Sequence, residues 1–268
     1  MDKKQKHTNI WDTVAPTFSK IGPNYWNIFG ERLVELSNIK DGGIVLDIGM
    51  GRGSSLFPAI KRVGTNGRVI GIDLSEKMVQ ETRRELLEKN IENAEVHMVD
   101  VKNISFNKET FDNIISGFFI TYLFYSEQKL YDISKTLKKG GKFSFSTWGK
   151  QVNQEWLTHI VEKYLEKNTS STGIKYNTID SIVYELRESG FHNIRIHEEK
   201  PHVIYRNNDE WWDEMNSNAF RGIIEEVKKK GINQLESFKA DVYKGLEQFT
   251  RKDGIYIKMP VIYAFCEK

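Results

Sequence analysis

Two periods of apolar residues alternate along the first 150 positions. Short apolar runs at Ile44–Ile48 and Arg68–Asp73 end in glycine or polar turns, which is typical of buried parallel strands. Between such runs, apolar residues recur every three or four positions, the period of a helix. The same pattern predicts strands at Glu95–Val99, Phe111–Ser116 and Lys142–Trp148. Strands that alternate with helices indicate a parallel sheet covered on both faces.

Polar capping residues mark where several helices begin. We expect Ser54 to cap a helix that runs to about Val63, and Ser75 to cap the helix SEKMVQETRRELLEKN, which is rich in good helix formers. A third helix covers Ser126–Leu137. The N-terminal segment Thr8–Ser37 has helical spacing too, in two pieces divided at Gly22-Pro23.

The pattern changes after Trp148, where helices become more frequent than strands. The expected elements are helices at Asn153–Lys167 and Thr178–Ser189, a strand at Asn193–His197, helices at Asp209–Lys230 and Ile232–Phe249, and a last strand at Ile257–Cys266. The chain is therefore expected to be an α/β protein with a Rossmann-like, doubly wound, mostly parallel seven-stranded sheet. A helical insertion at about 206–250 would precede the last strand.

Charge and cysteine content exclude several classes of protein. The formal net charge is only +2, whereas a protein that binds nucleic acid through phosphate contacts shows a concentrated basic face. The single cysteine, Cys266, excludes an internal disulfide and a paired-thiol metal site, and we expect no metal. The N-terminus is polar, and the apolar run Ile114–Phe124 is too short to span a bilayer. We expect a soluble cytoplasmic protein with no membrane span.

The stretch IVLDIGMGRGSSL at 44–56 carries the candidate chemistry. Glycine lets a ligand approach the backbone closely, so Gly49, Gly51 and Gly53 after a first strand predict a ligand site, although an ordinary tight turn would look the same. The dinucleotide fingerprint needs its third glycine one position later, where this chain has Ser54. Asp47, just before the glycines, would repel a pyrophosphate and attract a cationic ammonium group.

Five motifs together resemble the class I S-adenosylmethionine-dependent methyltransferases, in particular the small-molecule group that includes the ubiquinone and menaquinone C-methylating enzymes. The motifs are VLDIGMGRGSS at 45–55, GIDLS at 71–75, MVDV at 98–101, FDNIISGF at 111–118 and LKKGGKFSFSTW at 137–148. They follow one another at the ends of successive predicted strands and cover over a third of the chain.

The resemblance implies a role for each matching residue. Asp47 and the backbone of Gly49 and Gly51 would hold the methionine end of S-adenosylmethionine, and Asp73 would bind both ribose hydroxyls. The resemblance also places Asp100 and Val101 at the adenine, and Ser116 and Gly117 beside the methionine. Gly53, Leu74 and Met78 are further cofactor-binding positions that it implies. For each aspartate, the alternative role is a helix cap or a turn residue.

The segment WDTVAPTF at 11–18 resembles the N-terminal lid of the same group, in which an aromatic residue folds over the cofactor. Phe18 has that place and Tyr25 follows on the next helix, so residues 1–40 would form a helical lid on a methyltransferase domain at 41–268. A plain amphipathic core helix is the alternative.

Residues outside these motifs should select the acceptor. The aromatic residues suggest an apolar or aromatic small molecule, and the candidate substrate-binding residues are Phe118, Phe119, Tyr122, Trp148, Trp211, Trp212 and Met215. No catalytic base is evident, and His159 and Tyr122 are the only candidates. Alignment and water exclusion can supply much of the acceleration in an in-line methyl transfer.

Several alternatives stay open from the sequence. A protein or peptide methyltransferase leaves little trace in one chain, and a catalytically inactive S-adenosylmethionine-binding partner subunit would keep the same motifs. The glycine spacing and Asp47 argue against a nicotinamide dehydrogenase, and no nucleic-acid methyltransferase motif is present. The oligomeric state is open, with a homodimer as one expectation.

Overall fold

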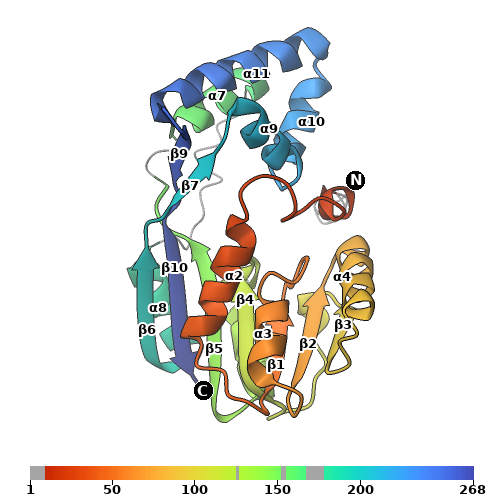
Figure 1. Cartoon of the computed structure of the whole chain (residues 1–268). Helices are drawn as coiled ribbons and strands as arrows, with labels where there is room; N and C mark the ends of the chain where they lie inside the picture. Colours follow the sequence, from red (N-terminus) through yellow and green to blue (C-terminus); the bar gives the residue numbers. More distant parts are fainter. Residues whose placement is uncertain (1–9, 125–126, 152–154, 167–177) are drawn as a thin grey trace.

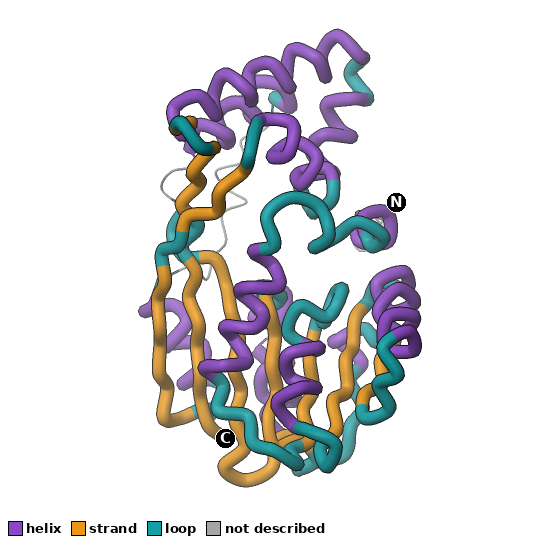
Figure 2. Tube along the Cα trace, in the orientation of Figure 1, coloured by secondary structure: helices purple, strands orange, loops and turns teal. Residues whose placement is uncertain are grey.

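The computed structural model describes residues 10–124, 127–151, 155–166 and 178–268. Figure 1 shows a large sheet flanked by helices, and above it a smaller part made of helices and short strands. The same view in Figure 2 shows that two extended segments connect the parts.

The large sheet has seven strands, as predicted. Its order is β3-β2-β1-β4-β5-β10-β6, and β10 runs antiparallel to both of its neighbours while β1 to β5 are parallel. The strands are β1 (Ile44–Ile48), β2 (Arg68–Asp73), β3 (Ala94–Met98), β4 (Phe111–Gly117), β5 (Leu137–Trp148), β6 (His192–Glu199) and β10 (Val261–Glu267). The carboxyl ends of β1, β2 and β4 therefore meet at one edge of the sheet.

Alternating side chains of the central strands fill two cores, one on each face. Val45 packs into the cluster with helices α2, α3 and α4, whereas Leu46 and Ile48 pack into the cluster with α5, α6 and α8. These helices are α2 (Tyr25–Leu36), α3 (Leu56–Val63), α4 (Glu76–Glu88), α5 (Ile120–Phe124), α6 (Glu127–Thr136) and α8 (Ile179–Glu188). Burial on both faces explains why β1 reads as a continuous apolar run interrupted only by Asp47.

The smaller part contains a three-stranded sheet that the sequence did not reveal. Its order is β7-β9-β8, and helices α7, α9, α10 and α11 cover it (Figure 1). The elements are α7 (Glu155–Leu165), β7 (His202–Tyr205), α9 (Asn208–Asn216), α10 (Arg221–Lys228), α11 (Ile232–Leu246), β8 (Thr250–Arg251) and β9 (Gly254–Lys258). We call residues 202–258 the insertion; its strands make it wider than the helical stretch 206–250 expected from the sequence.

Two expected elements are each divided in the structure. The strand expected at Ile257–Cys266 is two strands in different sheets, since Pro260 between β9 and β10 has no N–H to donate to a ladder. The helix expected at Asp209–Lys230 is interrupted where the Asn218 side chain accepts a hydrogen bond from the Phe220 backbone N–H (2.7 Å). Asparagine and serine compete with helical hydrogen bonds in this way.

The capping predictions had mixed outcomes. Ser75 does cap α4, because its hydroxyl accepts a hydrogen bond from the Met78 N–H. The Ser54 prediction was wrong: α3 begins after Ser55, and the Ser54 hydroxyl donates to Asn27 on α2 instead. The N-terminal segment is helical at 10–14 and then turns before α2 begins. Among the described residues, no helix is long and apolar enough to cross a membrane.

Candidate functional site

The loop between β1 and α3 carries the three glycines and folds back over the end of β2. The backbone N–H groups of Gly49 and Met50 both donate to the Ile72 carbonyl (2.9 and 3.1 Å). We call residues 49–53 the glycine loop, and its glycines have φ of +70°, +51° and +85°. Other residues rarely adopt this left-handed region, so the loop conformation itself selects glycine.

Two aromatic rings lie over the glycine loop from distant segments. A Cβ atom added at Gly49 would meet the Phe119 Cγ at 2.4 Å, so the Phe119 ring rests on bare backbone. A Cβ atom added at Gly51 would lie 3.8 Å from the Phe18 Cε1. The structure therefore brings Phe18 to the glycine loop, and its role in a lid stays a prediction.

Asp73 fixes the glycine loop at the end of β2. Its Oδ2 accepts a hydrogen bond from the Gly51 N–H and its Oδ1 from the Ser75 N–H, both at 2.9 Å. Burial raises the pKa of this carboxyl, and the backbone hydrogen bonds partly offset that effect. Each carboxylate oxygen keeps a further lone pair, so Asp73 can bind two hydroxyl groups while it holds the loop.

Asp47 is a fully buried carboxyl near the end of β1, two residues before the glycine loop. Its Oδ2 accepts a hydrogen bond from the Ser55 hydroxyl (2.9 Å), while its Oδ1 has no partner among the described residues. Burial, opposed by the Ser55 hydrogen bond and reinforced by the charge of Asp73, raises the pKa of Asp47 to about 7. A buried oxygen without a donor is costly, and a cationic ammonium group would supply what is missing.

The remaining predicted cofactor residues lie in three places. Ser116, Gly117 and Leu74 lie at the ends of β4 and β2, and the Ser116 hydroxyl donates to the Ile48 carbonyl at the end of β1. Met78 is buried in a small cluster with Phe18, Val14 and Ala15. Asp100 and Val101 begin the short helix η1 (Val101–Asn103), where Asp100 accepts a hydrogen bond from the Lys102 N–H and so also has the capping role named as its alternative.

Three partly exposed rings from three elements pack beside the loop. We call Trp26 of α2, Phe118 after β4 and Trp148 at the end of β5 the aromatic wall. The ring centroids lie 5.4 Å apart for Trp26 and Phe118, 5.6 Å for Trp26 and Trp148, and 4.3 Å for Phe118 and Trp148. The wall continues to Phe18, whose ring is 5.1 Å from that of Trp26.

The backbone of Phe118 is held in an unfavourable conformation. Its φ is +55°, which a bulky residue adopts only when its surroundings force it to, and the Phe118 N–H donates to the Ser146 carbonyl on β5 (3.0 Å). Such strain concentrates at functional sites. It keeps the Phe118 ring on Trp148, at the edge of the sheet where the predicted cofactor residues end.

Sequence reasoning missed two residues that attach the N-terminal segment to this edge. The buried guanidinium of Arg52, in the glycine loop, donates to the Ala15 carbonyl (2.7 Å) and pairs with Glu85 on α4 (3.2 Å). The Asp12 carboxylate accepts hydrogen bonds from the Ser75 hydroxyl (2.6 Å) and the Lys77 N–H. A buried arginine between two glycines was the available signal for the first contact.

Several predicted substrate and lid residues lie elsewhere. Trp211, Trp212 and Met215 of α9 are buried in the insertion, where the two indole rings pack against Trp156, Phe220, Phe238 and Tyr243. Tyr25, predicted to cover the cofactor, is buried and bonded to the insertion instead.

The two candidate bases gain no support from their positions. His159 occupies an exposed position of α7, which packs on α11. Tyr122 belongs to α5, and its side chain lies outside the described part. The His159 imidazole therefore lies on the surface of α7, and the prediction for Tyr122 concerns a side chain outside the described part.

Two surface hollows lie away from the predicted site residues. One has a volume of about 350 Å³ and is lined by Gly67, Arg68 and residues 92–95. The other has a volume of about 460 Å³ and is lined by Leu36, residues 195–197 and Phe265. Neither includes a predicted site residue. The site is identified instead by the strand ends, the glycine loop and the aromatic wall.

Comparison with known proteins relates this chain to methyltransferases. A family described as "Methyltransferase domain" matches residues 39–217. Aklanonic acid methyltransferase DauC of Streptomyces sp. (strain C5) is 32% identical over 144 residues, 54% of this chain and 66% of that protein. Nocamycin O-methyltransferase of Saccharothrix syringae is 35% identical over 108 residues, 40% of this chain and 39% of that protein. The chain thus spans about two thirds or less of these curated relatives.

Solved structures share the fold across nearly the whole chain. The YcgJ protein of Bacillus subtilis aligns with a TM-score of 0.61 at 16% identity, covering 90% of this chain and 98% of that one. Phosphoethanolamine N-methyltransferase 2 of Haemonchus contortus, solved with S-adenosyl-L-methionine, aligns with a TM-score of 0.63 at 19% identity, covering 96% and 57%.

Proposed function

We propose, from the premise that this chain belongs to the S-adenosylmethionine-dependent methyltransferases, that it methylates a flat, apolar or aromatic small molecule. The observation that carries the acceptor class is the aromatic wall beside the glycine loop, since partly exposed ring faces bind flat apolar molecules well. Curated relatives support a small-molecule acceptor, because their names refer to aklanonic acid, nocamycin and ubiquinone or menaquinone.

The residues at the strand ends fit S-adenosylmethionine. The unpartnered Oδ1 of Asp47 suits the cofactor's ammonium group, and the free lone pairs of Asp73 suit its ribose hydroxyls. The bare backbone of Gly49 leaves room for close approach once the Phe119 ring moves aside. When bound, the cofactor supplies a methyl group on a positively charged sulfur, which is already activated for transfer.

The chain's own residues then orient and enclose the reactants. The glycine loop, tethered by Asp73 and Ile72, fixes the donor end, and the aromatic wall fixes the plane of the acceptor. Phe18 and Phe119 cover the loop and exclude water. Alignment and water exclusion are the main sources of rate in such a site.

We further propose that residues 1–40 act as a lid on a domain formed by 41–268. The contacts of Asp12 with the start of α4 and of Ala15 with Arg52 support it, because they attach the segment to the cofactor loops. Removal of the first twenty residues, which takes away Asp12, Ala15 and Phe18, should reduce turnover severalfold. A truncated protein with full activity would refute the lid.

Two measurements test the proposed function. Isothermal titration with S-adenosylhomocysteine should show one site, and Asp73→Asn is the matched control for that site. Radiolabelled S-adenosylmethionine should then transfer its methyl group to one member of a panel that contains aklanonic acid, demethylmenaquinone and a mixture of basic peptides. Label only on the peptides would favour the protein methyltransferase alternative, and S-adenosylhomocysteine binding without any transfer would favour an inactive partner subunit.

A further inference from the structure

Glu214 is a buried carboxylate where the N-terminal segment meets the insertion. It belongs to α9 and is 1% exposed. Its Oε1 accepts hydrogen bonds from the Tyr25 hydroxyl (2.8 Å), the Trp26 Nε1–H (3.2 Å) and the Asn218 amide (2.9 Å), and its Oε2 from the Tyr205 hydroxyl (3.4 Å). All four donors are neutral side chains.

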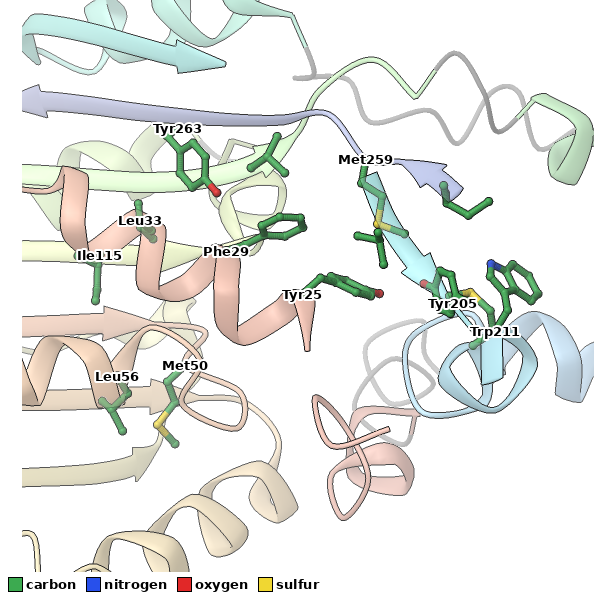
Figure 3. Packing of buried hydrophobic residues seen from close by; sticks show 14 of the residues in the cluster. Tyr25, Phe29, Leu33, Met50, Leu56, Ile115, Tyr205, Trp211, Met259 and Tyr263 are labelled. Carbon is green, nitrogen blue, oxygen red and sulfur yellow. The ribbon is translucent and has the colours of Figure 1, made fainter. Parts of the chain in front are cut away.

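The contacts of Glu214 join segments that are far apart in the sequence. Tyr25 and Trp26 come from α2, whereas Tyr205 and Asn218 come from the insertion. Figure 3 shows Tyr25 and Tyr205 directed toward each other from opposite sides of this junction. A Cβ atom at Gly22 would lie 2.9 Å from the Glu214 Cβ, so glycine at that position permits the close approach.

A buried carboxylate needs these donors. Burial raises the pKa of Glu214, and the hydrogen bonds from Asn218, Tyr25 and Trp26 oppose that effect. Loss of the carboxylate would leave the Tyr25 hydroxyl and the Trp26 N–H without it as an acceptor, and an unsatisfied buried donor is costly.

The polar groups of Tyr25 and Trp26 are therefore turned toward Glu214 and away from the wall. Trp26 is one of the three wall rings. The centroid of the Tyr25 ring lies 6.4 Å from that of Trp148, another wall ring. We propose, resting on the function proposed above, that Glu214 is a specificity-determining residue: by engaging the polar ends of Tyr25 and Trp26, it withholds these two donors from the acceptor wall.

The test is a ratio of two binding constants that needs no turnover. Protein saturated with S-adenosylhomocysteine is titrated with 2-ethylnaphthalene and with 2-acetylnaphthalene, and tryptophan fluorescence quenching is followed. The two probes have nearly the same shape and differ by one carbonyl acceptor. Wild-type protein should favour the ethyl compound more strongly than a variant with a free Trp26 N–H, because Glu214 engages that donor.

Variants of Glu214 should change that preference in a specific order. Glu214→Ala frees the Trp26 N–H and should shift the ratio toward the ketone by about fivefold or more, whereas Glu214→Gln keeps an acceptor oxygen and should stay close to wild type. Adding Trp26→Phe to Glu214→Ala removes the freed donor and should move the ratio back. Glu210→Ala, on the same helix and bonded to the exposed Arg206, is the control that should change nothing.

The contrary outcomes are distinct. If Glu214→Ala weakens both probes equally, Glu214 has only a structural role and the inference fails. If Glu214→Ala does not fold, the Glu214→Gln ratio decides, because a shift toward the ketone in that variant contradicts the inference and an unchanged ratio upholds it. Wild-type protein that binds neither naphthalene would also overturn it. Absence of methyl transfer in the acceptor panel would contradict the proposed function and leave this ratio unaffected.

Discussion

The two sides of the candidate site are built in opposite ways. The centre of the cofactor side is one short stretch, 44–56, whose glycines expose backbone and whose N–H groups bond to Ile72 and Asp73 on the neighbouring strand. The acceptor side is assembled from side chains as far apart as Tyr25 and Glu214, 189 positions distant. A local backbone surface can be recognised in a sequence, whereas an assembled side-chain surface depends on the tertiary structure.

The largest effect should come from replacing Asp73, whose carboxylate holds the glycine loop on the cofactor side. Asp73→Asn removes the charge that holds the Gly51 N–H and binds hydroxyls, so the affinity for S-adenosylhomocysteine should fall roughly 100-fold. Titration calorimetry measures it, with circular dichroism to confirm that the variant folds. An unchanged affinity would remove Asp73 from the ribose role.

A smaller effect should follow from loss of the Arg52 side chain, which attaches the N-terminal segment to the glycine loop. Arg52→Met keeps much of the side-chain volume but leaves the Ala15 carbonyl without its donor and Glu85 with Lys89 as its remaining ion-pair partner, so the free energy of unfolding should fall by about 2 kcal/mol. Urea denaturation measures the change. The matched control is Arg84→Met, an exposed ion-pair residue of α4, which should change stability by less than about 1 kcal/mol. Equal effects in both variants would contradict the link between loop and lid.

The smallest effect is a pH dependence set by Asp47. Its pKa of about 7 means that the carboxyl must lose a proton before it pairs with the cofactor's ammonium group. Affinity for S-adenosylhomocysteine should therefore rise roughly tenfold from pH 5.5 to 7, and fall again above about pH 8 as an α-amino group loses its charge.

Asp47→Asn is the control for that profile and should also remove a pH dependence of stability. Titration calorimetry over the same pH range should give a flat affinity for the variant between pH 5.5 and 7. Since the folded-state pKa is raised, the wild-type protein binds more protons folded than unfolded, and its stability falls as the pH rises from about 4 to about 7. A variant with the wild-type affinity profile would show that another group titrates.

Particular residues show what the sequence could and could not predict. The bounds of β1 and β2 were predicted correctly to the residue, because Gly49 ends the first apolar run and Asp73 ends the second. The three-stranded sheet was missed since β7 and β8 are only four and two residues long, too short for a period to appear. Aromatic content suggested Trp211 and Trp212 as acceptor contacts, but the same residue type fills the insertion core.

The missed polar contacts have a different cause. Glu214 reads in the sequence as one of several acidic residues on an amphipathic helix, and only the meeting of α9 with α2 buries it. Trp26 falls on the apolar face of α2, yet its ring is only partly buried and belongs to the wall. Spacing reveals which face of an element is apolar, but not which other element covers that face.

The chain passes between the two sheets twice, from β6 to β7 and from β9 to β10. Two of the chain's five prolines, Pro201 and Pro260, stand at these crossings, and the Met259 N–H donates to the Pro201 carbonyl (2.9 Å) across them. Entry and exit of the insertion are thus adjacent, and its length adds nothing to the closure of the main sheet. A foreign segment grafted between these prolines would leave the strands of the main sheet intact, so the junction offers a natural boundary for exchanging the insertion.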